Sequence, residues 1–346
     1  MKLMKSTANP ILSPLKENSW EAASTCNPGA WYENGTFYLL YRAAGFDDEH
    51  KINFGLAASK DGVVFKRLSA DPIFGPSADG PDAGCIEDAR IVKFNQDYYL
   101  TYAFRALPPG KYWEKNPSEV VAYDLTDIDP QAPLCISKNL TCSGLAMTRD
   151  FHNFRRLGRI TPANVDDRDV ILFPEKVDDK YVMLHRPMQW VGEKYGTAHP
   201  AIWISYSDDL LTWSDSQLLA TGGSTPWEEK IGGAAPPIKT PQGWLTLYHS
   251  AGKDKLYRVG VMLLDLHNPS QVVARAKDFI MEPEHYYEFE GFYNGVVFPT
   301  GSVVVGDKLY VYYGGADKYC CLAICSLSEL LAFVLRYQEP VSAVFL

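Results

Sequence analysis

The sequence has no long hydrophobic run, no excess of positive charge and little that favours helices, and these absences exclude several classes of protein. The N-terminal segment MKLMKSTANPILSP lacks an apolar stretch as long as a signal peptide or a membrane span requires, so we expect a cytoplasmic protein without membrane contact. A formal net charge of −9, from 33 Lys and Arg against 42 Asp and Glu, argues against a nucleic-acid partner.

Cysteine is also scarce, and its spacing favours neither disulfides nor a zinc site. The seven cysteines form an odd set without a CxxC pair, and most lie within apolar stretches, which is typical of buried free thiols. They are Cys26, Cys85, Cys135, Cys142, Cys320, Cys321 and Cys325.

What the chain does contain is a two-part pattern that occurs five times. The first part is a hydrophobic hairpin, whose polar turns lie near Asn34, Gln96, Asp179, Gln242 and Asp307. The second part is a short apolar strand that leads to a polar residue, with starts at Gly55, Gly144, Trp203, Gly260 and Cys321. Two hairpins per unit give four strands, the size of a propeller blade, and five units close a ring. We therefore predict an all-β protein, a five-bladed β-propeller with four-stranded antiparallel blades.

The propeller is expected to form one domain over residues 1–346, because blades bury their faces only against neighbouring blades. An insertion near residues 106–142 departs from the repeat, with five prolines and no clean strand alternation. It is either a lid or a subunit contact, or a surface insertion without a role. A short C-terminal helix is expected near residues 326–337, and a second helix is suggested at 117–125.

Charged residues interrupt the apolar pattern before one predicted strand, in the segment GPDAGCIEDARI. Glu87 and Asp88 are adjacent, and adjacent residues of an extended chain point to opposite faces. We therefore expect one carboxylate to face the central channel, while the other packs sideways or pairs with Arg90.

The next hairpin carries a candidate anion site. Arg168 and Asp169 open its first strand, and His185 and Arg186 close the returning strand. Because the start of one strand of a hairpin lies beside the end of its partner, these four side chains are expected to converge at one rim of the propeller.

The following hairpin repeats this arrangement, with Lys230 before its first strand and Tyr248 and His249 at the end of the return. Several cations around one cavity repel each other unless an anion lies among them, and phosphate suits arginine forks and a lysine charge. Asn27 and Arg42 occupy corresponding corners of the first hairpin, and Asp317 follows the last. Such amides, carboxylates and arginines among aromatic residues are typical of a sugar site.

Several motifs resemble those of glycoside hydrolase family 130, the inverting β-mannoside phosphorylases and their hydrolytic relatives. The likeness extends from Asn9 to about Leu335. The motifs are IEDARI, LFPEK, LHRP, WEEKIGGAAPPIKTPQGWLTLYH, NGVVFPTG and YYGGAD. The resemblance implies a five-bladed propeller in which Asp88 is the sole catalytic carboxylate. It implies that Asp88 protonates the glycosidic oxygen through the 3-hydroxyl of the mannosyl unit, while phosphate attacks the anomeric carbon from the opposite face.

The resemblance also assigns binding roles. Phosphate would be bound by Arg168, Arg186, Lys230 and His249, with Tyr248 close by, and the mannosyl ring by Asn27, Arg42, Asp88 and Asp317. Many family members have Asn where this chain has Asp169, which we expect to brace Arg168 or to contact a sugar hydroxyl. The resemblance further implies phosphate as co-substrate and α-mannose 1-phosphate as product, and it implies neither a metal nor an organic cofactor.

The choice of substrate rests on finer likenesses. The basic set favours phosphorolysis over hydrolysis, and the segment from Leu184 to Trp213 looks most like the β-1,2-mannobiose and β-1,2-oligomannan phosphorylases. Gln189, Tyr195 and His199 are then candidates for the acceptor side, as is Trp190 unless it packs within its blade. The alternatives are a β-1,4-mannooligosaccharide or mannosylglucose phosphorylase, a β-mannoside hydrolase, and a noncatalytic carbohydrate-binding propeller. A homo-oligomer is left open.

Overall fold

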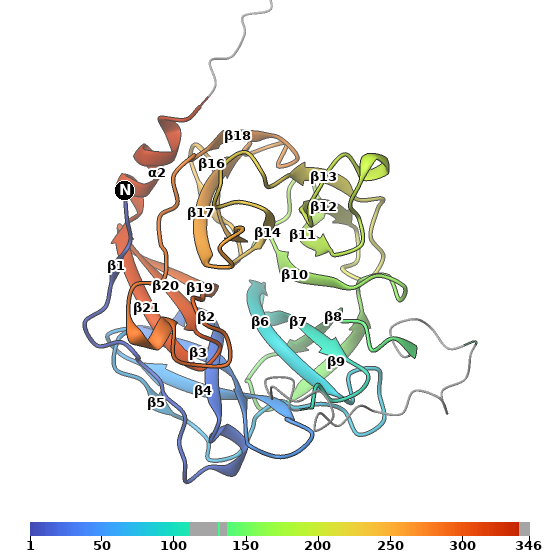
Figure 1. The fold of residues 1–346 in the computed structure, drawn as a ribbon, viewed down its shortest axis with the longest axis vertical. Helices are drawn as coiled ribbons and strands as arrows, with labels where there is room; N and C mark the ends of the chain where they lie inside the picture. Colours follow the sequence, from blue (N-terminus) through green and yellow to red (C-terminus); the bar gives the residue numbers. More distant parts are fainter. Residues whose placement is uncertain (111–130, 132–136, 339–346) are drawn as a thin grey trace, which may run out of the picture.

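Five antiparallel sheets surround a central axis in the computed structural model, which describes residues 1–110, 131 and 137–338 (Figure 1). Blade I consists of β2 (Ser24–Glu33), β3 (Thr36–Ala44), β4 (Ile52–Ser59) and β5 (Lys66–Arg67). Blade II consists of β6 (Cys85–Phe94), β7 (Asp97–Arg105), β8 (Cys142–Thr148) and β9 (Phe154–Arg159). Blade III consists of β10 (Asp167–Leu172), β11 (Tyr181–Pro187), β12 (Ile202–Ser207) and β13 (Gln217–Ala220). The predicted five-bladed propeller is confirmed.

The last two blades show how the chain adapts the repeat. In blade IV the inner strand is split into β14 (Lys230–Gly233) and β15 (Ile238–Thr240), and both halves pair with β16 (Gly243–Ala251). Pro236 and Pro237 lie in the gap, where their missing N–H groups cost the sheet no hydrogen bond. The blade continues outward with β17 (Tyr257–Leu264) and β18 (Val272–Arg275).

Blade V joins the two ends of the described chain. Its strands β19 (Val297–Val305), β20 (Lys308–Gly315) and β21 (Tyr319–Ser326) follow each other in sequence, but the outermost strand is β1 (Met4–Lys5). Figure 1 accordingly shows the N-terminus beside the last blade. The ring is therefore closed by a strand from its own N-terminal segment, which the repeat alone did not reveal.

Helix α2 (Leu327–Leu335) follows β21, within the segment predicted to be helical. The Ser326 hydroxyl accepts a hydrogen bond from the Glu329 N–H and caps the helix. Its buried residues Leu330, Phe333 and Val334 join the apolar cluster between blades IV and V. No helix in the described parts of the chain is long and apolar enough to cross a membrane. The suggested helix at 117–125 and most of the insertion at 106–142 lie outside the described residues.

A hydrophobic cluster fills the space between each pair of neighbouring blades. The five clusters join blades I and II, II and III, III and IV, IV and V, and V and I. Six of the cysteines are buried free thiols, as predicted, and Cys135 lies outside the described residues. Because each blade shares apolar packing with both neighbours, the positions of the inner strands around the axis are fixed together.

Four blades also contain the same buried polar cluster, which we call the blade triad. In each, a tyrosine hydroxyl donates to a buried carboxylate that also accepts from a cation on the outermost strand. The members are Tyr41, Glu21 and Arg67; Tyr102, Asp82 and Arg156; Tyr248, Glu228 and Arg275; and Tyr313, Glu288 and Lys5. In three of them a glycine on the next strand makes room for the ring, since a Cβ there would collide with it: Gly55, Gly144 and Gly260.

Candidate active site

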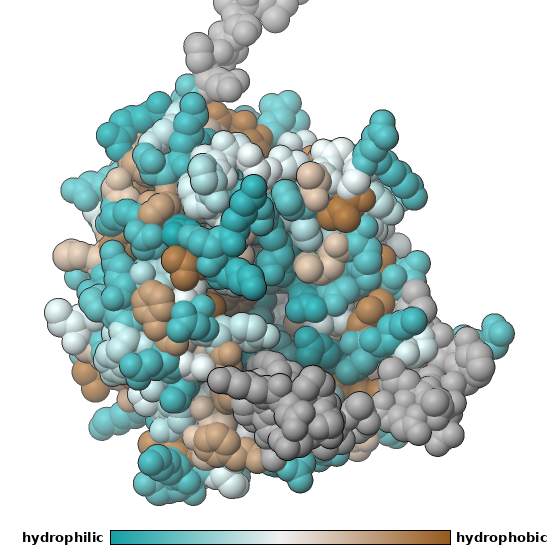
Figure 2. Space-filling model, in the orientation of Figure 1, coloured by the Kyte–Doolittle hydropathy of each residue, from teal (hydrophilic) through white to brown (hydrophobic). Residues whose placement is uncertain are grey.

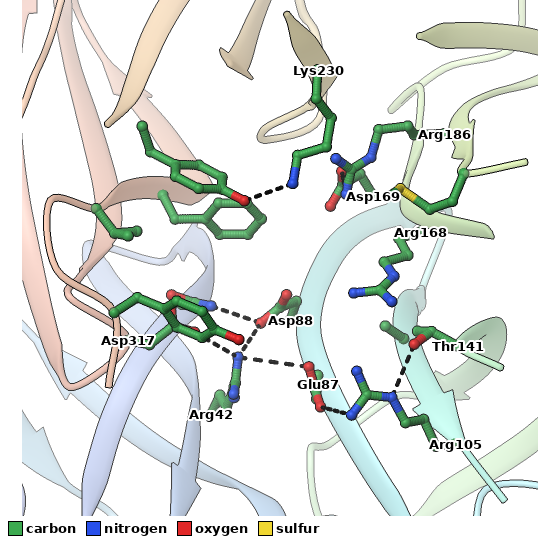
Figure 3. Close-up of a pocket in the computed structure, with 17 residues that line it drawn as sticks. Arg42, Glu87, Asp88, Arg105, Thr141, Arg168, Asp169, Arg186, Lys230 and Asp317 are labelled. Atoms are coloured by element: carbon green, nitrogen blue, oxygen red, sulfur yellow. Dashed lines mark hydrogen bonds and ion pairs between the residues drawn. The ribbon is translucent and has the colours of Figure 1, made fainter. Parts of the chain in front are cut away.

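A cavity of about 420 Å³ is lined by residues of all five blades (Figure 3). Five cations and four carboxylates line it: Arg42, Arg105, Arg168, Arg186, Lys230, Glu87, Asp88, Asp169 and Asp317. Uncharged side chains complete the wall: Asn27, Ala103, Thr141, Met188, Tyr257, Tyr293, Val296 and Phe298. Figure 2 shows mainly hydrophilic residues around the centre of this face of the molecule.

A bulge in the inner strand of blades I, II and III carries a cavity residue into the wall. Asn27, Asp88 and Asp169 have positive φ angles of 45°, 56° and 54°, and the strand register shifts at each. Asn and Asp adopt this left-handed conformation more readily than most residues. The expectation that Glu87 and Asp88 face opposite ways was therefore wrong, because the bulge interrupts the alternation and both carboxylates line the cavity.

On one side of the cavity, carboxylates surround the Arg42 guanidinium (Figure 3). Its Nη1 lies 3.1 Å from Asp88, 3.7 Å from Glu87 and 3.8 Å from Asp317. Burial, together with the neighbouring carboxylates of Asp88 and Glu87, raises the pKa of Asp317 to about 6 against the opposing effect of Arg42. Asp317 therefore changes its charge near pH 6.

Glu87 is held in its charged form. Burial opposes ionisation, but the guanidinium groups of Arg42, Arg105 and Arg168 outweigh it and lower the pKa of Glu87 to about 2. Arg105 Nη1 lies 3.9 Å from Glu87, and Arg105 Nε donates to the Thr141 hydroxyl at 3.0 Å. These residues form a second polar wall, next to the Arg42 cluster.

Cations gather on the opposite side of the cavity (Figure 3). Arg168 forms a two-point ion pair with Asp166, at 2.5 and 2.7 Å. Lys230 Nζ donates to the Tyr257 hydroxyl at 2.9 Å, and no described carboxylate forms an ion pair with it. Burial and the charge of Arg186 lower the pKa of Lys230 to about 8. An anion beside Lys230 would stabilise the charged form of its ammonium group.

Asp169 lies behind these cations and does not brace Arg168, contrary to one expectation. Its carboxylate lies 2.8 Å from Arg186 Nη2, 3.0 Å from His249 Nε2 and 3.3 Å from Arg90 Nη2. Despite burial, these groups hold the pKa of Asp169 well below its usual range. Arg186 Nε and Nη1 are buried and have no hydrogen-bond partner among the described residues, so two donors of this guanidinium are left unsatisfied.

Arg90 connects the two sides of the cavity. Its Nη1 donates to the backbone carbonyl of Asp88 at 2.8 Å, its Nε donates to the carbonyl of Ala234 at 3.2 Å, and its Nη2 faces Asp169. The expected pairing of Arg90 with a carboxylate side chain of Glu87 or Asp88 does not occur. The guanidinium instead fixes the bulged backbone of Asp88 relative to blades III and IV.

His249 and Tyr248, expected at the anion site, do not line the cavity. His249 is fully buried behind Asp169, and burial lowers its pKa to about 4, so its ring is neutral at pH 7. Tyr248 belongs to the triad of blade IV and donates to Glu228 at 2.5 Å. Tyr248 and His249 are adjacent in a regular strand, and strand alternation directs the tyrosine into the blade.

His185 is also turned away from the cavity, into blade III, where it is 2% exposed. The acceptor-side candidates lie outside the cavity lining as well. Gln189 accepts a hydrogen bond from the Asp166 N–H, Tyr195 stacks on Trp190, and Thr197 donates to the His199 carbonyl.

Trp190 packs edge-on against Trp203, with 4.9 Å between the ring centroids. This contact agrees with the alternative that Trp190 packs within its blade.

The sequence reasoning missed several residues of the cavity. Arg105 and Met188 lie two residues beyond Ala103 and Arg186, which occupy equivalent positions in blades II and III. Both could have been found by examining the residue two positions after Ala103 and after Arg186 on the returning strands. Tyr257 begins β17 and Phe298 lies in β19, and both positions fall outside the strand ends of the hairpin pattern that indicated the charged residues. No group of three or more metal-ligating residues is found in the described residues.

Three comparisons place the chain among known proteins. A model of glycoside hydrolase family 130, described as beta-1,4-mannooligosaccharide phosphorylase, matches residues 2–121 and 135–336. The chain is 36% identical over 336 residues to 1,2-beta-oligomannan phosphorylase from Thermoanaerobacter sp. (strain X514), with 95% of this chain and 99% of that protein covered. It is 35% identical over 335 residues to beta-1,2-mannobiose phosphorylase from the same organism, with 93% and 97% covered.

The fold is also similar to that of a solved relative. The structure of beta-1,2-mannobiose phosphorylase from Listeria innocua, in complex with beta-1,2-mannobiose, superposes with a TM-score of 0.77 at 27% identity. The match covers 96% of this chain and 99% of that one.

Proposed function

This chain belongs to glycoside hydrolase family 130 and is a β-mannoside phosphorylase, and we propose that it cleaves β-1,2-linked mannosides with inversion. The observation that carries this proposal is the division of one cavity into a carboxylate side around Arg42 and a cationic side around Arg186 and Lys230. A phosphorylase needs both, because a proton donor must act on the glycosidic oxygen while an anionic nucleophile attacks the anomeric carbon of the same bond.

Phosphate is proposed to lie among Arg168, Arg186 and Lys230. Arg186 has two buried N–H groups without a partner, and Lys230 has a lowered pKa among neighbouring cations. An oxyanion would accept hydrogen bonds from the N–H groups of Arg186 and would stabilise the charged form of Lys230. His249 is proposed to orient Asp169, and Asp169 in turn holds Arg186 in place. His249 does not itself contact phosphate.

The mannosyl unit is proposed to lie on the other side, against Asn27, Arg42, Asp88 and Asp317. Asp88 donates its proton to the 3-hydroxyl of the mannosyl unit, which passes its own proton to the glycosidic oxygen. The bond from the anomeric carbon to that oxygen breaks as phosphate forms a new bond from the opposite face. The products are α-mannose 1-phosphate and a shortened acceptor. This scheme needs one carboxylic acid, since phosphate replaces the activated water of an inverting hydrolase.

The acceptor sugar is proposed to contact the second polar wall. Glu87, Arg105 and Thr141 line the cavity beside the Arg42 cluster and offer charged and hydroxyl groups to sugar hydroxyls. Gln189, Tyr195 and His199 lie outside this lining, so we no longer assign them direct contact with the substrate.

Hydrolysis is less consistent with the cationic side. An inverting hydrolase activates water with a carboxylate opposite its acid. The carboxylate available there is Asp169, which is 3% exposed and pairs with Arg186, Arg90 and His249. Such a carboxylate is a poor base, because its neighbours hold the pKa well below the usual range.

The direct test is an incubation with β-1,2-mannobiose in the presence and absence of inorganic phosphate, followed by ³¹P NMR. We expect α-mannose 1-phosphate with phosphate and no cleavage without it, and less product from β-1,4-mannobiose. Mannose released equally in both conditions would indicate a hydrolase, and no turnover of any β-mannoside would indicate a binding protein. A cytoplasmic location would suit the proposed product, since a charged sugar phosphate is retained inside a cell.

A further inference from the structure

Blade III lacks the blade triad of the other four blades. Where Tyr41 precedes Arg42 in blade I, His185 precedes Arg186 in blade III. His185 Nδ1 lies 2.8 Å from Asp167 Oδ2, and its Nε2 lies 3.0 Å from the hydroxyl oxygen of Ser216. We call the chain Asp167–His185–Ser216 the His185 relay.

The relay lies directly behind the two arginines of the proposed phosphate site. Asp167 precedes Arg168 on β10 and His185 precedes Arg186 on β11, and the two arginines are themselves paired across the sheet. Since successive side chains of a strand point to opposite faces, the Asp167–His185 bond and the arginines occupy opposite faces of the same hairpin end.

The backbone ladder is interrupted next to this point. Arg168 is the second residue of β10, and the bulge that follows it leaves the next regular pair at Ile171. On the other side, the Met188 N–H donates to the Asp166 carbonyl at 2.7 Å, so the pair of Arg168 and Arg186 lies between this bond and the bulge. The side-chain bond between Asp167 and His185 spans this short stretch and fixes the two strands relative to each other.

The relay is also costly to bury, which argues that it serves more than packing. Asp167 is fully buried and His185 is 2% exposed, yet Asp167 Oδ1 has no hydrogen-bond partner among the described residues. A buried polar pair contributes little net stability compared with apolar residues of similar volume.

We propose that Asp167, His185 and Ser216 are positioning residues, which hold Arg168 and Arg186 at the spacing that phosphate binding requires. This inference rests on the proposed phosphorylase function. A nucleophilic role for Ser216 is not part of it, because none of the three residues lines the cavity. Nδ1 carries the proton that Asp167 accepts, and Nε2 accepts from a serine hydroxyl.

The test compares two matched variants in steady-state phosphorolysis of β-1,2-mannobiose. His185→Phe removes both ring nitrogens and keeps an aromatic ring, and Tyr102→Phe removes the equivalent polar group from blade II. We expect His185→Phe to raise KM for phosphate by at least about tenfold, as the loss of an orienting partner does, while KM for mannobiose stays within about twofold. His185→Asn, whose amide nitrogen takes the place of Nδ1, should recover most of the phosphate affinity. Tyr102→Phe should lower the melting temperature without changing KM for phosphate.

The results distinguish a failure of the positioning role from a failure of the proposed phosphorylase function. If the wild-type protein consumes phosphate but His185→Phe only lowers the melting temperature, or raises both KM values equally, the relay is structural and the inference is wrong. If His185→Phe does not fold, Ser216→Ala tests the outer end of the relay, because this residue is partly exposed and its hydroxyl lies 3.0 Å from His185 Nε2. A rise in KM for phosphate alone in this variant supports the inference, and an unchanged KM for phosphate contradicts it. A wild-type protein that cleaves mannobiose without phosphate would overturn the proposed function itself.

Discussion

The side-chain amide of Asn27 donates a hydrogen bond of 2.8 Å to Asp88 Oδ1, and the two residues occupy the same bulge position in neighbouring blades. Arg42 Nη1 donates to the same oxygen at 3.1 Å. Because an amide N–H and a guanidinium only donate, Oδ1 is kept as an acceptor. A proton on Asp88 is therefore carried by Oδ2, which is the oxygen that must face the sugar hydroxyl.

The first prediction concerns this proton. Asp88→Asn is nearly isosteric and keeps a carbonyl oxygen for Asn27 and Arg42, but it cannot supply an acid. We expect kcat to fall by roughly 10³-fold in both phosphorolysis and synthesis, which is the size of a general-acid contribution. The melting temperature should change little. Full activity of a folded Asp88→Asn protein would remove Asp88 from its assigned role.

The second prediction follows from Lys230, whose pKa is lowered to about 8. Its ammonium group is charged below this pH and neutral above it, and only the charged form attracts phosphate. We therefore expect KM for phosphate to rise several-fold between about pH 8 and about pH 9.5, a range in which phosphate itself stays a dianion. KM for mannobiose should not follow this curve.

Lys230→Arg is the control for this effect, since a guanidinium keeps its charge throughout this range. The variant should lose the alkaline rise in KM for phosphate, even if its affinity at pH 7 is reduced. An unchanged alkaline rise in Lys230→Arg would assign the titration to another group.

The third prediction concerns the stability of the carboxylate side. The pKa of Asp317 is raised to about 6, so ionising this group above that pH lowers the free energy of unfolding. The penalty is absent below the unfolded pKa of about 4 and complete above the folded value. Asp317→Asn should therefore raise the melting temperature at pH 8, and the gain should shrink as the pH falls toward 4.

This gain in stability should accompany a loss of activity, because Asp317 is proposed to hold the mannosyl ring. KM for mannobiose is expected to rise, with KM for phosphate little changed. A lower melting temperature at pH 8 would show that Asp317 is stabilised by Arg42 more than it is destabilised by burial and its neighbours.

The fourth prediction concerns Asp169, which compensates the charge of Arg186 and Arg90. Asp169→Asn removes that charge, and losing one partner of a buried ion pair costs about 3 to 5 kcal/mol. We expect a lower melting temperature without phosphate, and a larger rise on adding phosphate than the wild type shows, because the anion then replaces the missing charge. Equal shifts in both proteins would place phosphate elsewhere.

The architecture could be predicted from the sequence because each blade repeats its hairpin and its turn chemistry. Asn34 and Gly35, for example, both have positive φ angles, as a tight hairpin turn requires. The pairing of β1 with β21 could not be predicted, since a two-residue strand has no measurable periodicity.

The charged residues of the site could be identified, but their partners could not. Arg42, Arg186 and Lys230 stand out because they interrupt apolar strands. The bulge at Asp88 changes the face of the sheet to which the neighbouring side chains point. Nothing in the sequence distinguishes this bulge from a regular strand. Tyr248 was misassigned for a related reason, since a tyrosine beside a site residue can equally belong to a blade triad.

A crystal structure with inorganic phosphate bound is the decisive test of the proposed phosphate site. We predict phosphate density among Arg168, Arg186 and Lys230, across the cavity from Asp88. A crystal soaked at saturating phosphate that shows no density there, or shows phosphate at Arg42 instead, would contradict it.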